Sequence, residues 1–393
     1  MNKFSKEDKN KKKISRGKFA TIVITVAVTV IATVSAEIGL GIVSIVPKEN
    51  YDRYKKFEKL AKMEEMISET YYKDIKENDL IDGAMKGLFL GTGDPYSEYY
   101  TEEEMNLVKE STSGSFVGIG ITMLSDPETG IVEVTNSWET GPAYKSGIRA
   151  GDTLYKVEDV MVSYDTLDKA VSIMKGEEGK EVNVSVKRDG EIKKFKIKRA
   201  QVSEPSVTGK MMDDKVGYIQ ISTFIEKTSA DFRKELTALK KDGMRYLVLD
   251  LRNNGGGMVD QCCEVADELI GEGTIVYTED RNGNREEEKS DKNKLNLPIA
   301  VLTNENTASS SEILTGAIIG NKAGISVGTT TFGKGIVQSV VELHDKTGYK
   351  LTTAQYFTPD GKSIHEKGIK PTIEVKDEEA QLYRAIKWLK TGK

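Results

Sequence analysis

The stretch YLVLDLRNNGGG, residues 246–257, decides the fold class of this chain. A short apolar run that ends at a turn signal predicts a buried strand, and the turn signal here is a cluster of three glycines. Glycines at the end of a strand let backbone N–H groups approach a ligand with no side chain in the way. Such a loop can form half of an oxyanion hole, cradle a phosphate, or be a plain tight turn. The chain has no GxxxxGKS/T or GxGxxG pattern, which argues against the phosphate interpretation.

The segments around this strand alternate between strand and helix patterns. Such alternation predicts an α/β layer with partly parallel strands. The expected strands are 217–222, 246–251 and 299–302, and the expected helices are 229–241, 260–270, 310–319 and 377–390.

Residues 113–200 have a different pattern, in which short β-rich runs are separated by glycine and acidic turns. This pattern predicts a compact small β domain. A glycine-rich loop with free N–H groups ahead of a strand suits the capture of a C-terminal carboxylate, and the strand edge can accept the peptide as an added strand. A structural turn in an ordinary β domain explains the same loop equally well. The loop consists of Phe116, Val117, Gly118, Ile119 and Gly120.

The residues before this domain are predicted to be mostly helical. Apolar residues at helical spacing predict helices over 51–78 and 80–90. Proline and aspartate predict a turn over 94–99, and Thr101 followed by three glutamates predicts the capped start of another helix.

The N-terminus carries a basic flank followed by an apolar span. Residues 1–18 hold eight Lys or Arg, the next eighteen residues carry no charge, and apolar residues continue to Val46. This pattern predicts a membrane anchor over 19–46 with the N-terminus in the cytoplasm and the body outside. Because Val34, Ser35 and Ala36 resemble a small-residue cleavage site, a removable signal peptide is the competing interpretation. Both interpretations place the body outside the cytoplasmic membrane.

Composition limits the classes of function. The 393 residues exceed one ordinary core and suggest two or three domains, and 38% hydrophobic with 30% charged residues fits a folded body. A net charge of −5, with no basic stripe after the N-terminus, gives no reason to expect nucleic acid as a partner. The adjacent Cys262 and Cys263 are interpreted as packing residues without metal-ligand spacing. The sequence therefore predicts no metal and no cofactor.

A serine cluster lies between an expected strand and an expected helix, in the sequence TASSSE at 307–312. A serine at the N-terminal end of a helix can be an exposed nucleophile, and the positive end of the helix dipole stabilises a developing oxyanion. An ordinary helix cap by serine or threonine, with Glu312 in the first turn, explains the same residues. The residues alone do not choose among Ser309, Ser310 and Ser311.

A lysine flanked by glycines, Lys334, lies in the sequence FGKGIVQ at 332–338. A serine needs a base, but the only histidines are His344 and His365, both in polar loop-like sequence. Lysine can serve if burial lowers its pKa from about 10.4 towards the working pH. On a strand, Gln338 would share a face with Lys334 and orient its amine. A surface lysine in a hairpin is the alternative.

Taken in order, these segments resemble the C-terminal processing peptidases, also called tail-specific proteases. The resemblance covers roughly residues 50–376. The matching motifs are DPYSEYY (94–100), SGSFVGIG (113–120), GPAYKSGIRAGD (141–152), YIQISTF (218–224), LDLRNNGGG (249–257), TASSSEIL (307–314), FGKGIVQ (332–338) and DGKSIHEKGIKPTIEV (360–375).

This resemblance assigns roles to particular residues. It implies Ser309 as nucleophile, Lys334 as base and Gln338 as the partner that orients the base. It also implies that the amides of Gly255 and Ser310 form the oxyanion hole. The chain departs from the family pattern at Ser310, where alanine is common, at Asn254, where proline often precedes the glycines, and at His365, where an amide is common.

The resemblance also implies an α/β and α+β multidomain architecture. It implies that a PDZ domain, which takes substrate tails at residues 116–120, precedes an α/β protease core of the ClpP/crotonase type. Relatives use their terminal helices for dimer contacts, so a homodimer is a possible assembly. The expected parts are a cytoplasmic basic tail (1–18), a transmembrane signal-anchor (19–46), a helical region (51–112), the PDZ domain (113–198), the protease core (199–376) and a helical tail (377–393).

The expected function is that of a serine-type endopeptidase acting on exported or membrane proteins with exposed apolar C-terminal tails. The alternative is a catalytically silent scaffold that binds tails through its PDZ domain. The expected location is the cell membrane, with the catalytic part outside, and secretion after cleavage near Ala36 is the alternative.

Overall fold

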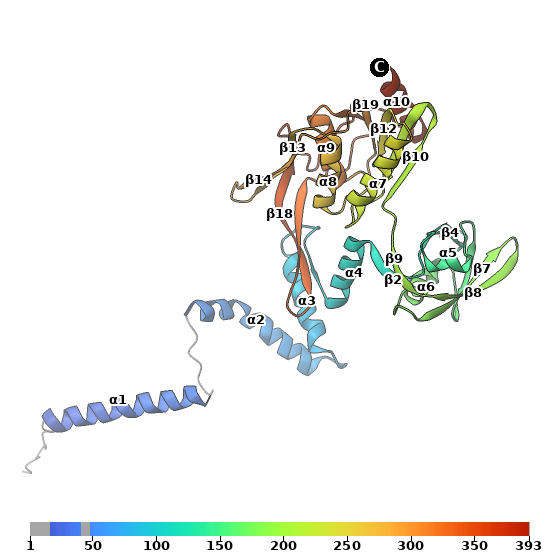
Figure 1. Cartoon of the computed structure of the whole chain (residues 1–393). Coiled ribbons are helices and arrows are strands. Elements are labelled where there is room, and N and C mark those ends of the chain that lie inside the picture. The colour runs from blue at the N-terminus through green and yellow to red at the C-terminus, as the bar shows by residue number, and fades with distance from the viewer. Residues whose placement is uncertain (1–15, 41–47, 393) are drawn as a thin grey trace, which may run out of the picture. The chain divides into compact units, whose positions relative to one another are not determined.

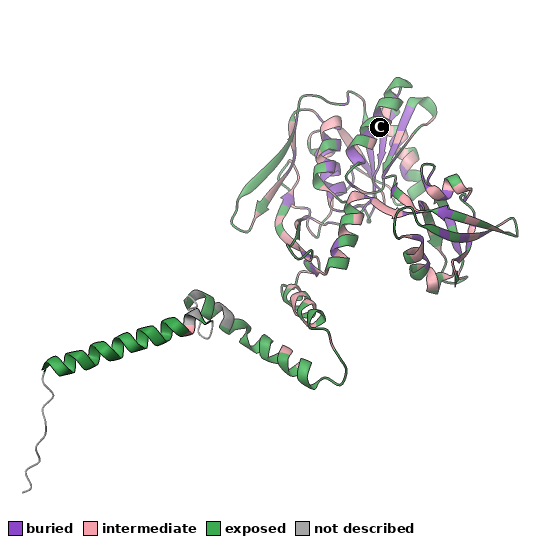
Figure 2. Cartoon of the chain, turned by 60° about the horizontal axis from the view of Figure 1, so that its bottom comes forward, coloured by how far each residue is buried: buried purple, intermediate pink, exposed green. Residues whose placement is uncertain are grey.

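The computed structural model describes residues 16–40 and 48–392, which form two compact units divided between Gly83 and Ala84. Parts of the predicted basic tail and anchor, at 1–15 and 41–46, lie outside the described residues. Helix α1 (Arg16–Gly39) is long and apolar enough over Arg16–Glu37 to cross a membrane. Figure 2 shows α1 exposed along nearly its whole length.

The single helix predicted over 51–78 is wrong. Helix α2 (Lys48–Thr70) ends at Thr70, and helix α3 (Glu77–Leu90) begins only at Glu77. The break holds two adjacent tyrosines and an aspartate, residue types of low helix propensity, and the acidic first turn of α3 favours a new start there. The predicted start after Thr101 is confirmed: Thr101 caps helix α4 (Glu102–Ser113) through a capping box with Glu104.

The centre of the second unit is a six-stranded sheet in the order β10-β11-β12-β15-β16-β19. All neighbouring strands are parallel except β10 and β11. The predicted α/β layer is therefore confirmed, and every predicted element in it lies within one residue of the observed one (Figure 1). The elements are β10 (Val207–Met211), β11 (Val216–Ile221), α7 (Thr228–Lys241), β12 (Tyr246–Asp250), α8 (Val259–Leu269), β15 (Ile299–Thr303), α9 (Ser310–Gly320), β16 (Gly324–Gly328), β19 (Ile373–Glu374) and α10 (Glu378–Thr391).

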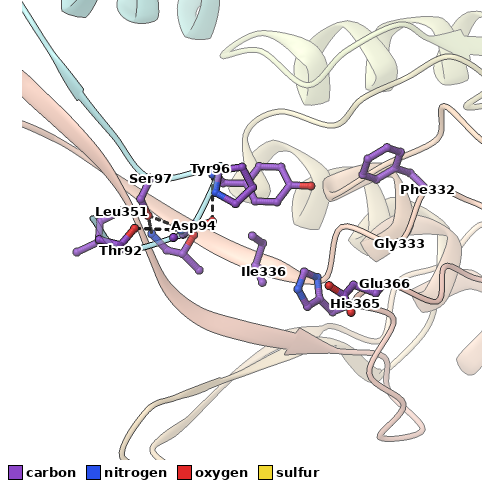
Figure 3. Close-up of a pocket in the computed structure, with 13 residues that line it drawn as sticks. Thr92, Asp94, Tyr96, Ser97, Phe332, Gly333, Ile336, Leu351, His365 and Glu366 are labelled. Atoms are coloured by element: carbon purple, nitrogen blue, oxygen red, sulfur yellow. Dashed lines mark hydrogen bonds between the residues drawn. The ribbon is translucent and has the colours of Figure 1, made fainter. Parts of the chain in front are cut away.

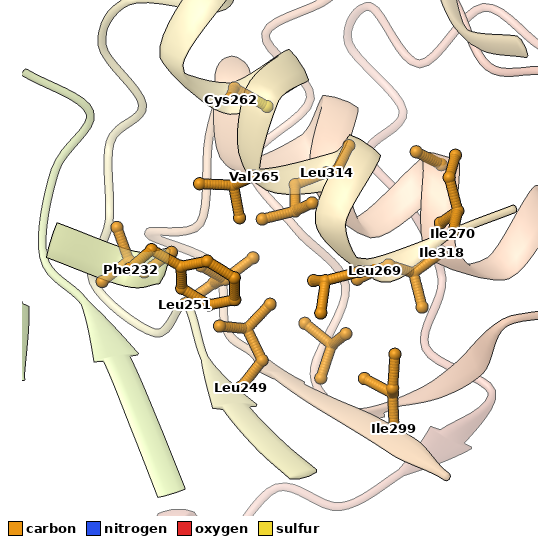
Figure 4. Close-up of a cluster of buried hydrophobic side chains, with 14 of the residues drawn as sticks. Phe232, Leu249, Leu251, Cys262, Val265, Leu269, Ile270, Ile299, Leu314 and Ile318 are labelled. Carbon is orange, nitrogen blue, oxygen red and sulfur yellow. The ribbon is translucent and has the colours of Figure 1, made fainter. Parts of the chain in front are cut away.

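The two faces of this sheet pack against different helices. Along β12, successive side chains point to opposite faces, so Leu247, Leu249 and Leu251 join the core beneath α7, α8 and α9. Val248 points the other way and packs with residues of α10. Figure 4 shows the first core, in which Cys262 is one of the packed side chains. The apolar stretch that predicted the strand is therefore buried on both faces.

A second sheet carries the segment that follows Lys334. Strand β17 (Ile336–Glu342) pairs antiparallel with β18 (Gly348–Phe357), and the pairing has a register shift between Val337 and Gln338. Strand β18 also pairs with β1 (Glu98–Tyr100) and with β13 (Gly273–Asp280), which pairs with β14 (Arg285–Ser290). This sheet brings the turn at 94–97 next to the segment around residue 338, although about 240 residues separate them in sequence.

The small β domain predicted over 113–200 is present as a β-rich module. A five-membered strand path, β3-β4-β5-β7-β8, carries the short β6 on β5, and a two-stranded sheet joins β2 to β9. Its elements are β2 (Ser115–Gly118), β3 (Ile121–Ser125), β4 (Val132–Ser137), α5 (Pro142–Ser146), β5 (Thr153–Val157), β6 (Val160–Met161), α6 (Leu167–Met174), β7 (Glu181–Arg188), β8 (Glu191–Lys198) and β9 (Ala200–Ser203).

Candidate active site

Ser309 lies at the junction between the loop that leaves β15 and the first turn of α9. Its backbone has φ 56° and ψ −121°, a conformation that non-glycine residues rarely adopt. Strain of this kind persists only where the surrounding structure enforces it, and it is common at functional sites. Here the enforcement comes from the neighbouring loop, because the Ala308 N–H donates to the Asn254 carbonyl at 3.0 Å and the Thr307 hydroxyl donates to the Leu251 carbonyl at 2.8 Å.

The three serines of the cluster point to different places. Ser309 lines a cavity of about 590 Å³. Ser310 is fully buried, and its hydroxyl donates to the Gly257 carbonyl at 2.8 Å. The Ser311 hydroxyl is buried without a hydrogen-bond partner. Of the three side chains, only that of Ser309 is thus available to a ligand in the cavity.

The glycine loop packs directly against Ser309. A Cβ atom at Gly256 would lie 2.8 Å from the Cβ of Ser309, so only glycine fits there. Gly255 lines the same cavity, and a Cβ atom there would meet nothing within 4 Å. Among the hydrogen bonds of the described residues, none uses the N–H of Gly255 or of Ser310 as donor. The N–H groups of Gly255 and Ser310 are therefore available to bind a ligand beside Ser309.

Lys334 lies in the loop that precedes β17, so the premise that Lys334 and Gln338 share one strand is wrong. The register shift at Val337 and Gln338 nevertheless brings the two side chains together, and the Lys334 amine donates to Gln338 Oε1 at 2.8 Å. The Gln338 Nε2 in turn donates to the Tyr96 carbonyl at 2.7 Å. The Lys334 amine also lies 4.7 Å from the centre of the Tyr96 ring.

The environment of Lys334 favours the neutral amine. Burial lowers the pKa of this half-buried lysine below its ordinary value, and the charge of Lys350 lowers it further. The charges of Asp94 and Glu98 act in the opposite direction. Lys334, Gln338, Gly255 and Ser309 all line the one cavity. Among the described residues, no hydrogen bond joins the Ser309 hydroxyl to the Lys334 amine.

A fully buried carboxylate connects the two segments that carry Ser309 and Lys334. Glu312 Oε2 accepts hydrogen bonds from the N–H groups of Ser309 and Lys334, each at 2.9 Å. Its Oε1 accepts from the Gly333 N–H at 2.8 Å and from the Thr331 hydroxyl at 2.5 Å. The residue interpreted from sequence as part of an ordinary helix cap therefore also fixes the loop around Lys334.

A second cavity, of about 730 Å³, lies on the Tyr96 side of Lys334. Figure 3 shows its walls: the turn at 94–97 on one side, and Phe332 and His365 on the other. Asp94 shapes the turn, because its carboxylate accepts from the Tyr96 N–H at 3.0 Å and from the Ser97 hydroxyl at 2.5 Å. His365 lies in the wall of this second cavity, and it makes no hydrogen bond with Ser309 in the part of the chain that the structure describes.

The prediction of a loop over 116–120 is wrong for most of the segment, because residues 116–118 belong to β2 and pair with β9. Only Ile119 and Gly120 lie between β2 and β3. The Ile119 side chain is buried in the core of that module, so only its main chain is available to a ligand. The Ile119 carbonyl accepts from the Ala143 N–H at 2.8 Å, and the Gly120 carbonyl accepts from the Trp138 N–H at 3.1 Å. Phe116 packs edge-on against Trp138, with the ring centres 5.9 Å apart.

Sequence matches to known protein families and relatives extend over nearly all of the described chain. Residues 215–375 match peptidase family S41, residues 115–198 match the PDZ domain, and residues 39–104 match the N-terminal domain of the activating protease CtpB. The carboxy-terminal processing protease CtpA of Bacillus subtilis is 35% identical over 322 residues, which cover 81% of this chain and 69% of the relative. The chain belongs to peptidase family S41. It is a serine-type peptidase with a PDZ domain.

Two further relatives resemble this S41 peptidase over most of its length. A CtpA-like serine protease of Staphylococcus haemolyticus is 33% identical over 376 residues, covering 95% of this chain and 73% of the relative. The solved photosystem II D1 C-terminal processing protease is 30% identical with a TM-score of 0.50, covering 84% of this chain and 90% of the other. The predicted fold, a PDZ domain with a mixed α/β peptidase core behind an apolar N-terminal helix, is confirmed.

Sequence reasoning missed the contacts made by three residues in the candidate active site of this S41 peptidase. Glu312 was visible only as a capping residue, and Tyr96 only as part of a turn. The hydroxyl of Tyr356 contacts the main-chain carbonyls of both Ser309 and Lys334. No motif or spacing in the sequence indicated a role for this tyrosine. Helical spacing and turn chemistry report on local structure, whereas these three contacts join segments 22 to 242 residues apart.

Proposed function

We propose that this S41 peptidase hydrolyses peptide bonds with Ser309 as nucleophile, Lys334 as general base and Gln338 as the residue that orients the base. The observation that carries the proposal is the Lys334 amine, which is half-buried, has a lowered pKa and faces the same cavity as Ser309. A base of this kind takes a proton from the attacking hydroxyl, which is a poor nucleophile until it loses that proton.

The proposed reaction runs in two steps. The neutral Lys334 amine takes the proton of the Ser309 hydroxyl as Oγ forms a bond to the scissile carbonyl carbon. The N–H groups of Gly255 and Ser310 bind the resulting oxyanion, and the Lys334 ammonium returns the proton to the leaving amine as the peptide bond breaks. Lys334 then takes a proton from water as its oxygen attacks the acyl carbon. The bond from that carbon to Ser309 Oγ breaks, the Lys334 ammonium returns the proton to Oγ, and the carboxylic acid leaves. No hydrogen bond joins the Ser309 hydroxyl to the Lys334 amine among the described residues, so these two groups must come closer when substrate binds. Lys334 can keep donating to Gln338 as it does so, because its lone pair is the part that takes the proton.

The charge of Lys350 offers a test of Lys334 as the base. Lys350 lines the same cavity, and its amine pairs with Glu98 at 3.0 Å. Lys350→Met removes a charge that lowers the pKa of Lys334, and it takes from Glu98, whose charge raises that pKa, the cation that it pairs with. The pKa of Lys334 should therefore rise, and the alkaline rise of kcat should move to higher pH.

The measurement for this variant is kcat against pH on one peptide substrate. Lys362→Met serves as the matched control, because Lys362 is an exposed lysine paired with Asp360 away from this cavity. The control profile should coincide with that of the wild type. A profile of Lys350→Met that stayed in place or moved to lower pH would remove Lys334 as the titrating base.

We further propose that the substrates are proteins with exposed apolar C-terminal tails, bound through their carboxylate at residues 116–120. The PDZ domain matched at residues 115–198 and the names of the relatives support the proposal, since both CtpA of Bacillus subtilis and the photosystem II D1 protease are named for carboxy-terminal processing. A carboxylate held by loop N–H groups, with the tail added to a strand edge, is a known mode of peptide recognition.

Ser309→Ala, which should bind without cutting, tests tail recognition directly. It is expected to bind peptides that end in a free apolar residue at least about tenfold more tightly than the same peptides with an amidated C-terminus, because the amide removes the charge-assisted hydrogen bonds. Fluorescence anisotropy measures both affinities, and wild-type cleavage of the free-acid peptide is followed in parallel. Equal affinities would contradict tail recognition, and binding by wild type without any cleavage would support the silent scaffold.

We propose that α1 holds the enzyme at the cell membrane with its catalytic part outside. The support is the apolar helix Arg16–Glu37 behind a basic flank. Secretion after cleavage near Ala36 remains the other reading of the same segment. N-terminal sequencing of the mature protein distinguishes the two, because cleavage would create a new terminus at Glu37.

A further inference from the structure

Tyr356 lies on β18, directly beside the segment that carries Lys334. Its main-chain N–H donates to the Gly335 carbonyl at 3.1 Å, which anchors the residue to the start of β17. Its side chain is 2% exposed. The hydroxyl lies 3.0 Å from the main-chain carbonyl of Ser309 and also contacts the main-chain carbonyl of Lys334. One buried hydroxyl therefore touches the peptide groups of both residues of the proposed catalytic pair.

The direction of these hydrogen bonds follows from the partners. Carbonyl oxygens only accept, so the Tyr356 hydroxyl must be the donor to both, sharing one proton in a three-centre bond. Burial and the nearby Glu312 hold the pKa of Tyr356 well above its ordinary value, so the hydroxyl keeps its proton over the working range of pH. Tyr356 is thus a permanent donor and not a candidate base.

The two carbonyls depend on this donor to different degrees. The Ser309 carbonyl already accepts from the N–H groups of Glu312 and Ile313, at 2.8 and 3.0 Å. The Lys334 carbonyl has no other donor among the recorded hydrogen bonds of the described residues. Loss of the hydroxyl would therefore leave the Lys334 carbonyl without a partner at a site that burial keeps from water.

Tyr356 and Glu312 hold opposite ends of the same two residues. Glu312 accepts from the N–H groups of Ser309 and Lys334, and Tyr356 donates to their carbonyl groups. We propose that Tyr356 is a positioning residue, which locks the main chain of Lys334 against that of Ser309 so that amine and hydroxyl meet in the cavity. The inference rests on the proposed function, since it gives Tyr356 no role unless Ser309 and Lys334 react together.

Tyr356→Phe removes the hydroxyl and keeps the ring. We expect kcat for peptide hydrolysis to fall about 10- to 100-fold with KM changed less than threefold, because misplacement by a fraction of an ångström costs rate more than binding. The alkaline rise of kcat, assigned to Lys334, should also shift in pH as the amine leaves its site. A tyrosine on the same strand, Tyr349, supplies the matched control, because Tyr349→Phe removes a hydroxyl that does not line the cavity.

The readouts separate a positioning role from a loss of fold. Thermal unfolding gives the folded fraction of each variant, and labelling of Ser309 by a fluorophosphonate, run well below the unfolding midpoint, gives the reactivity of the nucleophile in folded molecules only. Tyr356→Phe should label about 10- to 100-fold more slowly than wild type, whereas Tyr349→Phe should label at the wild-type rate. Incorporation of 4-aminophenylalanine at position 356, which restores a donor, should recover most of the lost rate.

The same experiment includes Ser309→Ala and Lys334→Met, so that two failures can be told apart. If those two variants are inactive while Tyr356→Phe matches wild type in kcat, pH profile and labelling, the positioning role of Tyr356 is wrong. The proposal that Ser309 and Lys334 catalyse the reaction is then supported. If Lys334→Met still cleaves at the wild-type rate, the proposed function itself fails. A Tyr356→Phe variant with a raised KM and an unchanged kcat would also overturn the inference.

Discussion

Lys334→Met is expected to lower kcat by about 10⁴- to 10⁶-fold, the range seen when one member of a catalytic unit is removed. Methionine fills much of the same half-buried volume but has no lone pair to take the Ser309 proton. The fold should survive, because the substitution removes an amine whose burial is itself unfavourable. Wild-type kcat should rise with pH as the amine loses its proton. Since the pKa of Lys334 is lowered, this rise should begin below the ordinary lysine range, and the variant should lack it.

The control for this variant addresses the two histidines. If lysine is the base, a double variant carrying His344→Gln and His365→Gln should keep kcat within a few fold of wild type. Stopped assays on one peptide substrate, with protein concentration corrected for the folded fraction, compare all three proteins. Loss of activity in the histidine variant together with its survival in Lys334→Met would replace the lysine mechanism with a histidine one.

Glu312→Gln is expected to lower both stability and activity. The amide keeps the shape of the side chain, but its NH₂ group must face two donors that the carboxylate accepted, either Ser309 and Lys334 or Gly333 and Thr331. Two buried donors left without acceptors cost roughly 2–6 kcal/mol of unfolding free energy. The two catalytic segments should also move relative to each other, which is expected to lower kcat at least about 10²-fold.

Chemical denaturation and kcat at a temperature where the variant is folded measure the two effects separately. Glu305→Gln, in the loop that precedes α9, is the matched control, because Glu305 is exposed and its carboxylate accepts from the Thr329 hydroxyl. It should leave both quantities unchanged. Wild-type kcat in a folded Glu312→Gln protein would mean that this carboxylate supports the fold without positioning the catalytic residues.

Much of the fold could be predicted because its signals are local. The alternation of apolar runs and helical spacing located β11, β12 and β15 and the helices α7 to α10 to within one residue, whereas β10, β16 and β19 were not predicted. The failure at residues 71–76 has the same origin: apolar spacing continues through the break, and only weak helix propensity marks it. The strand argument for Lys334 and Gln338 failed as well, because β17 begins only at Ile336 and leaves Lys334 in the preceding loop.

The site was predictable only where a motif carried it. The ordered motifs implied Ser309, Lys334 and Gln338, and no reasoning from the residues alone separated Ser309 from its two neighbours. The structure supplies a physical distinction, since Ser310 is turned to the Gly257 carbonyl and Ser311 is buried. Which hydroxyl faces a cavity depends on the walls of that cavity, and those walls come from five separate segments of the chain.

By itself, the sequence around YLVLDLRNNGGG determined an α/β layer that ends in a glycine loop, because strand length, apolar pattern and glycine placement act over a few residues. The tertiary structure alone decided why the glycines are needed: Gly256 leaves room for the Cβ of Ser309, 2.8 Å from where its own Cβ would stand. It also decided how Glu312, Tyr96 and Tyr356 contact the segments that carry the proposed catalytic residues Ser309, Lys334 and Gln338. These contacts join residues remote in sequence, and no local pattern encodes a distance across the fold.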